Sequence, residues 1–355
     1  MYLAVFPKPA PIMGAVFPPG EYLCENRNAG EFLAHDICTL KEATAAHTPR
    51  RFDPAQDWNG RRILFVRPGG FGDLLFLTPI FAEIKRRWPA AAIDVACFAK
   101  YTPALQGNPD VARLVPYPVN LSTWGDYDAH FWLQNVIEGN PKAEELHVVD
   151  LLAEEAGLTL AGKEMKYCPA PSELASAHRA YPRHVEGRPR VGIQVAASTP
   201  VRSYPPRLVG AVSAELLKKG WEVYLFGSPG QLTTELPVVN LTQRTPPVSF
   251  RESAALLATC DVCVAPDSAL IHLAGAMNLP AVGLYGSFPW KLRTAYAPKT
   301  VALTGTLRCA PCFHHPIGPK MFPETGPCQR SRECDALAAI DPQRVVAKVE
   351  SLLKA

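Results

Sequence analysis

The sequence predicts an α/β fold made of two halves of similar construction. From residue 62 onward, short apolar segments alternate with longer segments whose apolar residues recur at helical spacing, and the same rhythm restarts after residue 190. Such alternation is typical of a parallel sheet covered by helices on both faces. The proline-rich passage YPRHVEGRPR, at 181–190, separates the halves and indicates a linker. With 355 residues, the chain is long enough for two domains with separate cores.

The first half follows an irregular extension, residues 1–60, to which we assign no chemistry. Within this extension, 21–25 and 31–37 flank the turn NRNAG and predict a hairpin. A kink is expected at Pro79, because proline removes a helical hydrogen bond. After the extension we expect strands at 63–67, 92–98, 114–118 and 127–133, and helices at 72–88 and 143–157.

The second half repeats this rhythm. Its first helix begins at a proline and ends at Gly220, and its last has Asp341 as N-cap and Pro342 in the first turn. We expect strands at 191–196, 222–227, 261–266, 281–286 and 300–305, and helices at 205–220, 249–260, 268–278 and 341–353. The predicted domains are an extension at 1–60, an N-terminal domain at 61–185, and a C-terminal domain at 186–355 with a cysteine-rich loop at 309–334.

Charge and hydropathy exclude several classes of protein. The net charge of +3, from 36 basic and 33 acidic residues, is too small to indicate a nucleic-acid-binding protein. The basic run Lys85, Arg86 and Arg87 is expected to complement a helix dipole, with contact to an anionic substrate as the alternative. No apolar run approaches the roughly 20 residues of a membrane span, and prolines interrupt the apolar N-terminus, unlike a signal peptide. We therefore expect a cytoplasmic protein whose ten cysteines are reduced thiols or metal ligands.

The stretch GGFGD, at 69–73, lies where a strand is expected to become a helix. Its glycines lack the spacing G-x-G-x-x-G, and Asp94 stands at the start of the second strand, where it could not hold a ribose. The carboxylate of Asp73 would also repel a phosphate bound in this turn. Asp73 is either a first-turn acid of the helix or a general base at the carboxyl end of a strand.

Two other turns at predicted strand ends carry groups suited to phosphate. In APDSALIH, the backbone N–H groups of 268–270 would be exposed donors at a helix N-terminus. Asp267 could instead be a helix cap, and His272, one turn along, is either a donor to a sugar hydroxyl or phosphate, or a core histidine. In AASTPVR, the hydroxyls of Ser198 and Thr199 beside Arg202 suit a diphosphate, with an ordinary polar loop as the alternative.

Four cysteines surround a loop rich in proline and glycine. Cys309 and Cys312 form a C-x2-C pair, and Cys328 and Cys334 follow at the looser C-x5-C spacing. Such a set suits a tetrahedral structural site for zinc or iron, in which His314 or His315 could replace a thiolate. The alternative is a group of reduced thiols. Cys260 and Cys263 would point to opposite faces of a strand and do not indicate a metal pair.

Three stretches in this order resemble glycosyltransferase family 9, the ADP-heptose:lipopolysaccharide heptosyltransferases and their relatives. They are ILFVRPGGFGDLLFLTPIFAEIKRRWP, AASTPVRSYP and APDSALIHLAGAMNLPAVGLYGSFPW, and the resemblance covers roughly residues 62–352. It implies a GT-B fold, with two Rossmann-like domains facing each other across a cleft. It further implies an acceptor in the N-terminal domain, a nucleotide-sugar in the C-terminal domain, and inversion at the anomeric carbon without a metal in the chemistry.

The resemblance also assigns roles to single residues. Asp73 matches the aspartate proposed as the base of the family, and Arg202 matches a basic residue, usually Lys, that holds the diphosphate, with a hydroxyl at Ser198 in the same loop. Asp267, Ser268 and His272 match the element D-S/T-G-x-x-H, which binds phosphate and sugar. Two further departures stand in this sequence: Ala269 replaces the usual glycine, and Gln231 stands where relatives often carry an acidic residue for the ribose.

The expected function is therefore an inverting glycosyltransferase that moves a heptose from ADP-heptose to a hydroxyl of a lipopolysaccharide core or related glycan. Alternatives are a hexosyl- or protein O-heptosyltransferase of the same fold, and a non-catalytic nucleotide-sugar-binding protein. An NAD-dependent oxidoreductase is disfavoured by the missing fingerprint. No cofactor is expected for the chemistry, nucleic acid is not an expected partner, and membrane contact would be peripheral at most.

Overall fold

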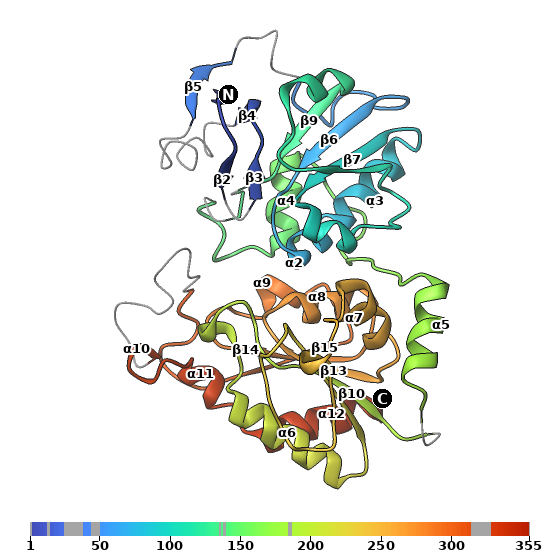
Figure 1. Ribbon diagram of the computed structural model, residues 1–355, viewed down its shortest axis with the longest axis vertical. Coiled ribbons are helices and arrows are strands. Elements are labelled where there is room, and N and C mark those ends of the chain that lie inside the picture. The colour runs from blue at the N-terminus through green and yellow to red at the C-terminus, as the bar shows by residue number, and fades with distance from the viewer. Residues whose placement is uncertain are drawn as a thin grey trace. The chain divides into compact units, whose positions relative to one another are not determined.

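The computed structural model describes residues 2–12, 15–24, 38–43, 50–134, 136–137, 140–183, 187–313 and 328–354. They form two compact units, Met1–Lys163 and Glu164–Ala355, each with its own sheets (Figure 1). The division lies earlier in the chain than the boundary at 185/186 expected from the sequence. Helix α5 (Pro171–Ala180) accounts for the difference, because it packs on α7 (Phe250–Leu257) and is joined to it by the ion pair of Glu173 with Arg251.

The first unit is built on a four-stranded parallel sheet in the order β8-β7-β6-β9. Its strands are β6 (Arg62–Val66), β7 (Ala92–Cys97), β8 (Arg113–Pro116) and β9 (Ala129–Trp132), at the positions expected from the sequence. Its helices are α2 (Phe71–Leu75), α3 (Thr78–Arg87) and α4 (Val148–Ala156), with short 3-10 helices η2 (Ala99–Ala104) and η3 (Leu121–Asp126).

The helix expected over 72–88 is broken into α2 and α3. Pro79 lies in the first turn of α3, where its missing N–H leaves no helical hydrogen bond unmade. The hydroxyl of Thr78 donates a 2.8 Å hydrogen bond to the carbonyl of Leu75 and so gives this carbonyl at the end of α2 a partner. The expected kink is therefore a full break, which leaves the turn that carries Asp73 on a short helix of its own.

The helix expected over 143–157 begins later, at Val148. His147 is its N-cap, and its Nδ1 accepts a hydrogen bond of 3.1 Å from the backbone N–H of Val149. The helix ends at Gly157, which has a φ of 64°, as glycine commonly does at this position.

The extension covers one face of the first parallel sheet. Strands β1 (Tyr2–Phe6), β4 (Gly20–Cys24) and β5 (Thr39–Glu42) form an antiparallel sheet in the order β4-β1-β5, beside the hairpin of β2 (Ala10–Ile12) and β3 (Ala15–Phe17). β4 pairs with β1, and the turn and second strand of the hairpin expected across NRNAG, 26–37, lie outside the described residues.

Alternation along β6 explains how both faces of this sheet are filled. Leu64 and Val66 belong to one core with Phe6, Phe17 and other residues of the extension. Phe65, between them in sequence, points to the opposite face, where its ring packs edge-on against Phe81 of α3 at 5.2 Å between centroids. The run ILFV is therefore apolar throughout because both of its faces are buried.

The second unit contains a six-stranded parallel sheet in the order β12-β11-β10-β13-β14-β15. Its strands are β10 (Arg190–Gln194), β11 (Glu222–Phe226), β12 (Val239–Asn240), β13 (Val262–Pro266), β14 (Ala281–Tyr285) and β15 (Thr300–Thr304). Five of them confirm the expected strands, and only the two-residue β12 was not anticipated.

Helices cover both faces of the second sheet. In Figure 1, α6 (Pro206–Lys218) and α12 (Pro342–Leu353) lie on one face, and α7 and α8 (Ala269–Ala276) lie on the other. Short elements complete the unit: η4 (Pro200–Arg202), η5 (Leu241–Gln243), α9 (Lys291–Thr294), α10 (Cys328–Ser331) and α11 (Asp335–Ala338).

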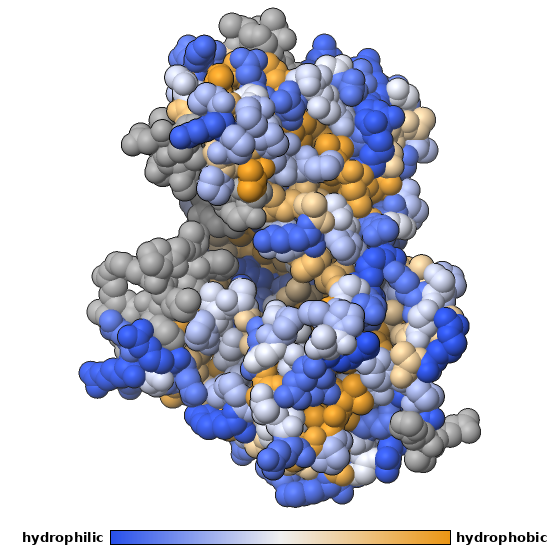
Figure 2. Space-filling view, viewed as in Figure 1, coloured by the Kyte–Doolittle hydropathy of each residue, from blue (hydrophilic) through white to orange (hydrophobic). Residues whose placement is uncertain are grey.

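The surface is mainly hydrophilic on the face shown in Figure 2, where polar side chains surround small apolar patches. Among the described residues, the large apolar side chains exposed to solvent are those of Val16 and Leu307. None of the helices in the described ranges combines the length and apolar character that a bilayer crossing requires.

Candidate functional site

Three loops of the second unit meet at the carboxyl ends of β10, β13 and β14. β10 and β13 are neighbours at the point where the strand order reverses, which is where open α/β sheets bind ligands. Arg202, from the loop after β10, has Nη1 at 3.8 Å from Oδ2 of Asp267, which follows β13. His272, on α8, has Nε2 at 3.5 Å from Oδ1 of the same carboxylate. The structure thus brings together residues that lie 70 positions apart in the sequence.

Asp267 is the centre of this group. Its side chain is buried, and a second arginine, Arg293, places Nε at 3.8 Å from Oδ2. Burial alone would raise the pKa of Asp267, but the contact with His272 and the charges of Arg293 and Arg202 outweigh it. The pKa of this carboxyl therefore lies well below its ordinary value, and Asp267 is a fixed negative charge between two guanidinium groups.

Asp267 is not a helix cap. The N-cap of α8 is Ser268, and the structure gives Ser268 no side-chain capping bond. The capping alternative considered for Asp267 is thus corrected, because its carboxylate turns toward the arginines and His272 instead of toward the first turn of α8.

Several buried polar atoms in this group have no hydrogen-bond partner within the described part of the chain. A buried polar group without a partner is unfavourable by about 1–3 kcal/mol, so natural structures rarely keep several of them together. These atoms lie in the two loops after β10 and β13: Thr199 Oγ1, Arg202 Nε, Asp267 Oδ2 and Ser268 Oγ. The arrangement suits a polar ligand that would satisfy them.

The remaining donor-site candidates lie at the rim of this group. Ser198 is exposed, and its hydroxyl accepts a 2.7 Å hydrogen bond from Nη2 of Arg202. Ala269 is the first residue of α8 and is half-buried. Gln231, after β11, is exposed, and its carbonyl oxygen accepts a 2.8 Å hydrogen bond from the backbone N–H of Ser228. The Gln231 side chain is therefore folded over its own loop.

In the first unit, Asp73 lies after the carboxyl end of β6. Its Oδ2 accepts a 2.7 Å hydrogen bond from the backbone N–H of Gly70, which is the N-cap of α2. Its Oδ1 accepts a 2.8 Å bond from Nη2 of Arg67, whose Nη1 donates to the carbonyl of Leu133. The side chain of Asp73 is 34% exposed, while that of Arg67 is 5% exposed. The carboxylate is thus held in one orientation and still reaches solvent.

The first glycine of GGFGD, Gly69, is required by its close neighbours. A Cβ at this position would stand 2.8 Å from Oδ2 of Asp73 and 3.1 Å from Nε of Arg67. Only glycine leaves room for the ion pair at this distance. Gly69 therefore makes room for the carboxylate and its partner and is not part of a dinucleotide fingerprint.

The basic run and Asp94 are engaged within the first unit. Arg86 and Arg87 bond to the buried Glu83, and these bonds, with that of Arg86 the largest influence, lower the pKa of Glu83 to about 2. Lys85 donates to the carbonyls of Pro89 and Ala91. The run therefore pairs mainly with a carboxylate of its own helix, which the dipole interpretation did not anticipate.

Asp94 is fully buried in β7. Its carboxylate accepts hydrogen bonds from the side chains of Arg62 and Arg113 and from the hydroxyl of Tyr127.

The four cysteines gather near the end of β14. Burial is the main cause that raises the pKa of Cys334 to about 11, and the nearby Cys312 and Cys328 add to it. Cys309 and Cys312 raise the pKa of Cys328 in the same way, after burial. Among the described residues, which leave out 314–327 and therefore His314 and His315, no three metal-binding side chains are arranged around a common point.

Arg293 and Phe288 are residues of this site that the sequence analysis missed. Both follow β14, and the guanidinium of Arg293 lies over the Phe288 ring at 4.4 Å from its centroid. The stretch SFPWKLR carries no motif that marks Arg293, although its place after a predicted strand of a parallel sheet was a usable signal.

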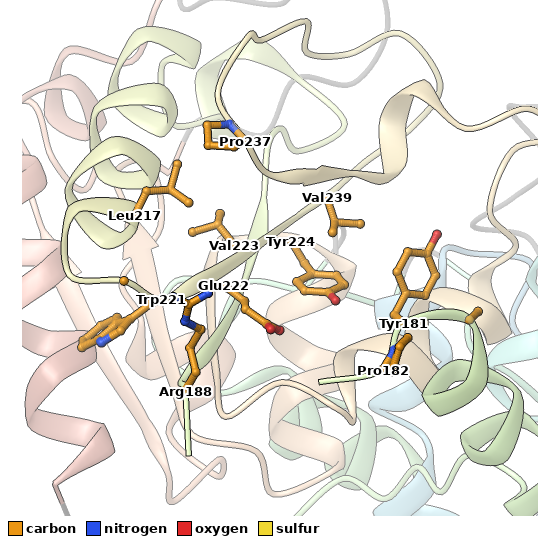
Figure 3. Close-up of a pocket in the computed structure, with 12 residues that line it drawn as sticks. Tyr181, Pro182, Arg188, Leu217, Trp221, Glu222, Val223, Tyr224, Pro237 and Val239 are labelled. Carbon is orange, nitrogen blue, oxygen red and sulfur yellow. The ribbon is translucent and has the colours of Figure 1, made fainter. Parts of the chain in front are cut away.

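A separate cavity of about 430 Å³ lies at the amino ends of β10 and β11 (Figure 3). Its lining includes Tyr181, Arg188, Trp221 and Tyr224. It contains none of the predicted site residues and lies at the opposite edge of the sheet from Arg202 and Asp267.

Comparison with known proteins agrees with this arrangement. The chain is 24% identical over 364 residues to lipopolysaccharide heptosyltransferase 1 of Pseudomonas aeruginosa, covering 83% of this chain and 98% of the relative. It resembles the solved structure of Escherichia coli ADP-heptose lipopolysaccharide heptosyltransferase II, with a TM-score of 0.63 at 20% identity, covering 82% of this chain and 98% of that one.

A third similar structure is the dodecameric iron-containing heptosyltransferase TibC in complex with ADP-D-β-D-heptose. The TM-score is 0.62 at 14% identity, covering 84% of this chain and 78% of TibC. These likenesses show the fold, which is GT-B with two Rossmann-like α/β domains. The model of glycosyltransferase family 9 (heptosyltransferase) matches residues 123–319, more than half of the chain. The protein therefore belongs to glycosyltransferase family 9 and is a glycosyltransferase.

Proposed function

We propose that the protein transfers a heptose from ADP-heptose to a hydroxyl of a lipopolysaccharide core or related glycan, with inversion at the anomeric carbon. The observation that carries this proposal is the set of unpartnered buried polar atoms around Arg202 and Asp267 at the strand-order reversal of the second unit. A nucleoside diphosphate would supply the acceptor oxygens that the arginine and the hydroxyls lack. The similar proteins are heptosyltransferases, and TibC is described in complex with ADP-D-β-D-heptose.

Asp73 is the base in this proposal. It takes the proton of the acceptor hydroxyl while that oxygen forms the new bond to the anomeric carbon, and the bond to the diphosphate breaks. The side chain of Arg67 and the backbone N–H of Gly70 orient its carboxylate. The exposed part of the side chain leaves room for an acceptor.

The departing nucleoside diphosphate gains negative charge as the glycosidic bond breaks. Arg202, the hydroxyls of Ser198 and Thr199, and the backbone N–H groups at Ser268 and Ala269 would stabilise that charge. Asp267 and His272 would bind sugar hydroxyls or orient the arginines, and Gln231 would face the ribose. Because these groups are positioned before the reaction, they need little reorganisation when the charge develops.

The cysteines would hold a structural metal. Four free thiols are a soft donor set, which fits zinc or iron. An ion held by Cys309, Cys312, Cys328 and Cys334 would cross-link the loop and take no part in the transfer. TibC, a similar structure, is described as iron-containing.

We place the reaction in the cytoplasm, with at most peripheral contact to a membrane and no nucleic-acid partner. The buried free thiols of Cys260 and Cys263 suit a reducing compartment. A hexose donor, a protein hydroxyl as acceptor and a non-catalytic binding protein are the alternatives that the following experiment separates.

The first test combines donor binding with transfer. Thermal stability of the wild-type protein would be measured with ADP, UDP, GDP, CDP, ADP-heptose and NADH, and stabilisation by ADP and ADP-heptose is expected by mass action. Asp73→Asn should bind these donors as the wild type does, while its transfer of heptose to a core glycan should fall roughly 100- to 10,000-fold. The control Asp126→Asn changes an exposed aspartate of the same unit and should transfer normally.

Each other outcome has a definite meaning. Preference for UDP or GDP would replace heptose by another sugar and keep the mechanism. Donor binding without transfer to any glycan or protein acceptor would favour the binding protein. Near wild-type transfer by Asp73→Asn would refute the assignment of the base.

A further inference from the structure

We propose that Arg293 is a second ligand of the donor diphosphate and binds the phosphates together with Arg202. This inference rests on the proposed function, because it names another residue of the same donor site. No sequence motif pointed to Arg293. It is carried by the position, burial and incomplete pairing of the guanidinium.

Arg293 is held in place by its surroundings. α9 follows β14, and the hydroxyl of Tyr285, the last residue of β14, donates a 3.0 Å hydrogen bond to Oγ1 of Thr294. The backbone N–H of Arg293 donates to the carbonyl of Trp290 at 2.9 Å. The Phe288 ring lies 4.4 Å from the guanidinium and covers one of its faces. The planar group is therefore positioned before a ligand arrives.

Most N–H groups of the Arg293 guanidinium have no hydrogen-bond partner among the described residues. Arg293 is 8% exposed, and the one hydrogen bond that its side chain makes to the described residues runs from Nη1 to the carbonyl of Leu292, at 3.2 Å. The nearest carboxylate oxygen, Oδ2 of Asp267, lies at 3.8 Å, beyond hydrogen-bond distance. An arginine has five N–H donors, and a buried arginine is normally paired with an anion. A ligand with several anionic oxygens would complete its bonds.

The local charge also favours an anion. Arg202 and Arg293 both approach the same oxygen of Asp267 at 3.8 Å, so two positive charges flank one negative charge. The excess positive charge lies in a buried place, where it is poorly screened. A diphosphate carries more than one negative charge and can accept forked bonds from both guanidinium groups. The geometry thus fits a clamp of two arginines, with Asp267 as the spacer that keeps them apart.

The test compares Arg293→Gln with Lys291→Gln. Lys291 is exposed on the same short helix, so its replacement removes the same charge without touching the site. Binding of ADP and of adenosine to the full-length protein would be measured by calorimetry and ligand-detected NMR. Arg293→Gln should weaken ADP binding by about tenfold or more and leave adenosine binding unchanged, because charge-assisted bonds to phosphate would be lost. Lys291→Gln should bind both ligands as the wild type does.

The outcomes that would overturn the proposal differ from failure of the proposed function. Unchanged ADP affinity in Arg293→Gln, or an equal loss for ADP and adenosine, would show that Arg293 only supports the fold. If the wild type binds no nucleoside diphosphate, the proposed function and this inference fall together. Should Arg293→Gln be unfolded by circular dichroism, Arg293→Lys keeps the charge without the planar fork. Its ADP affinity should fall between those of the wild type and of Arg202→Gln, and wild-type affinity would contradict the clamp.

Discussion

Two carboxylates at strand ends, Asp73 and Asp267, have different surroundings. Asp267 is buried between arginines and His272, which favour a permanent negative charge. Asp73 is one-third exposed, and the Arg67 side chain and the backbone N–H of Gly70 orient its carboxylate. A base must reach its substrate, whereas a spacer between cations need not. These surroundings therefore support the base role for Asp73 and a binding role for Asp267.

We predict that Arg67 controls how well Asp73 acts as the base and at which pH. In Arg67→Met the carboxylate loses a neighbouring cation, which favours the ionised form of a carboxyl group, and an orienting bond. We expect the acid limb of the pH–rate profile for transfer to move to higher pH. We also expect kcat to fall by roughly tenfold or more, with little change in KM for the donor. Steady-state kinetics between pH 4 and 9 would measure both effects.

Two further variants separate orientation from stability. Arg67→Lys keeps the charge without the fork and should restore the pH profile in part. Arg113→Met breaks another arginine–carboxylate pair in the same sheet, with the buried Asp94, and should lower thermal stability without moving the profile. If Arg67→Met shifted nothing except thermal stability, Arg67 would be structural only.

At the scale of elements, the cysteine loop is connected to the donor site. The backbone N–H of Phe313, next to Cys312, donates to the carbonyl of Ser287 at 2.8 Å, and the Phe313 ring packs edge-on against Phe288. Phe288 in turn supports Arg293. At the other end of the loop, Cys334 lies so close to Gly286 that a Cβ there would stand 2.7 Å from its sulfur. A cross-link among these cysteines would therefore fix the loop after β14.

Elemental analysis of the purified protein should find about one zinc or iron per chain. Cys312→Ser should lose this metal and melt at a lower temperature, because one of four ligands is removed. Cys168→Ser changes an exposed cysteine outside the group and should keep both the metal and the melting temperature. Wild-type protein without metal, or Cys312→Ser with a full complement, would contradict the structural metal site.

At the scale of the whole molecule, the chain is two units with separate cores. The second unit buries its own sheet between α6 and α12 on one side and α7 and α8 on the other, and α5 covers part of α7. All predicted donor residues belong to this unit, whereas Asp73 belongs to the first. Donor binding and catalysis should therefore be separable by cutting the chain.

A fragment of residues 164–355 should fold and bind ADP without transferring heptose. A matched fragment of 186–355 starts at the boundary that the sequence suggested and lacks α5. It should be less stable, because Arg251 and the face of α7 under α5 become exposed. Circular dichroism melts and ADP-induced thermal shifts would compare the two fragments. Equal stability would show that α5 contributes nothing to the second unit.

Local pattern was sufficient for the strands and for the turns that follow them. Apolar runs such as ILFV and VGIQVA predict buried strands wherever they occur, and in a parallel sheet the residues after each strand must share one edge. The gathering of Arg202, Asp267 and His272 followed from this rule. The sequence pattern did not predict the break between α2 and α3, where the Thr78 side chain donates a hydrogen bond to the backbone carbonyl of Leu75.

The sequence by itself determined the α/β class, the strands of the two parallel sheets apart from β12, the family, and the residues at the strand ends, because each depends on local periodicity or on short motifs. Only the tertiary structure decided that the extension fills one face of the first sheet, and that Arg67 and Arg293 stand beside Asp73 and Asp267. Contacts between residues far apart in the chain depend on which strands become neighbours and how closely their loops pack. The spacing of residues along one chain does not contain that information.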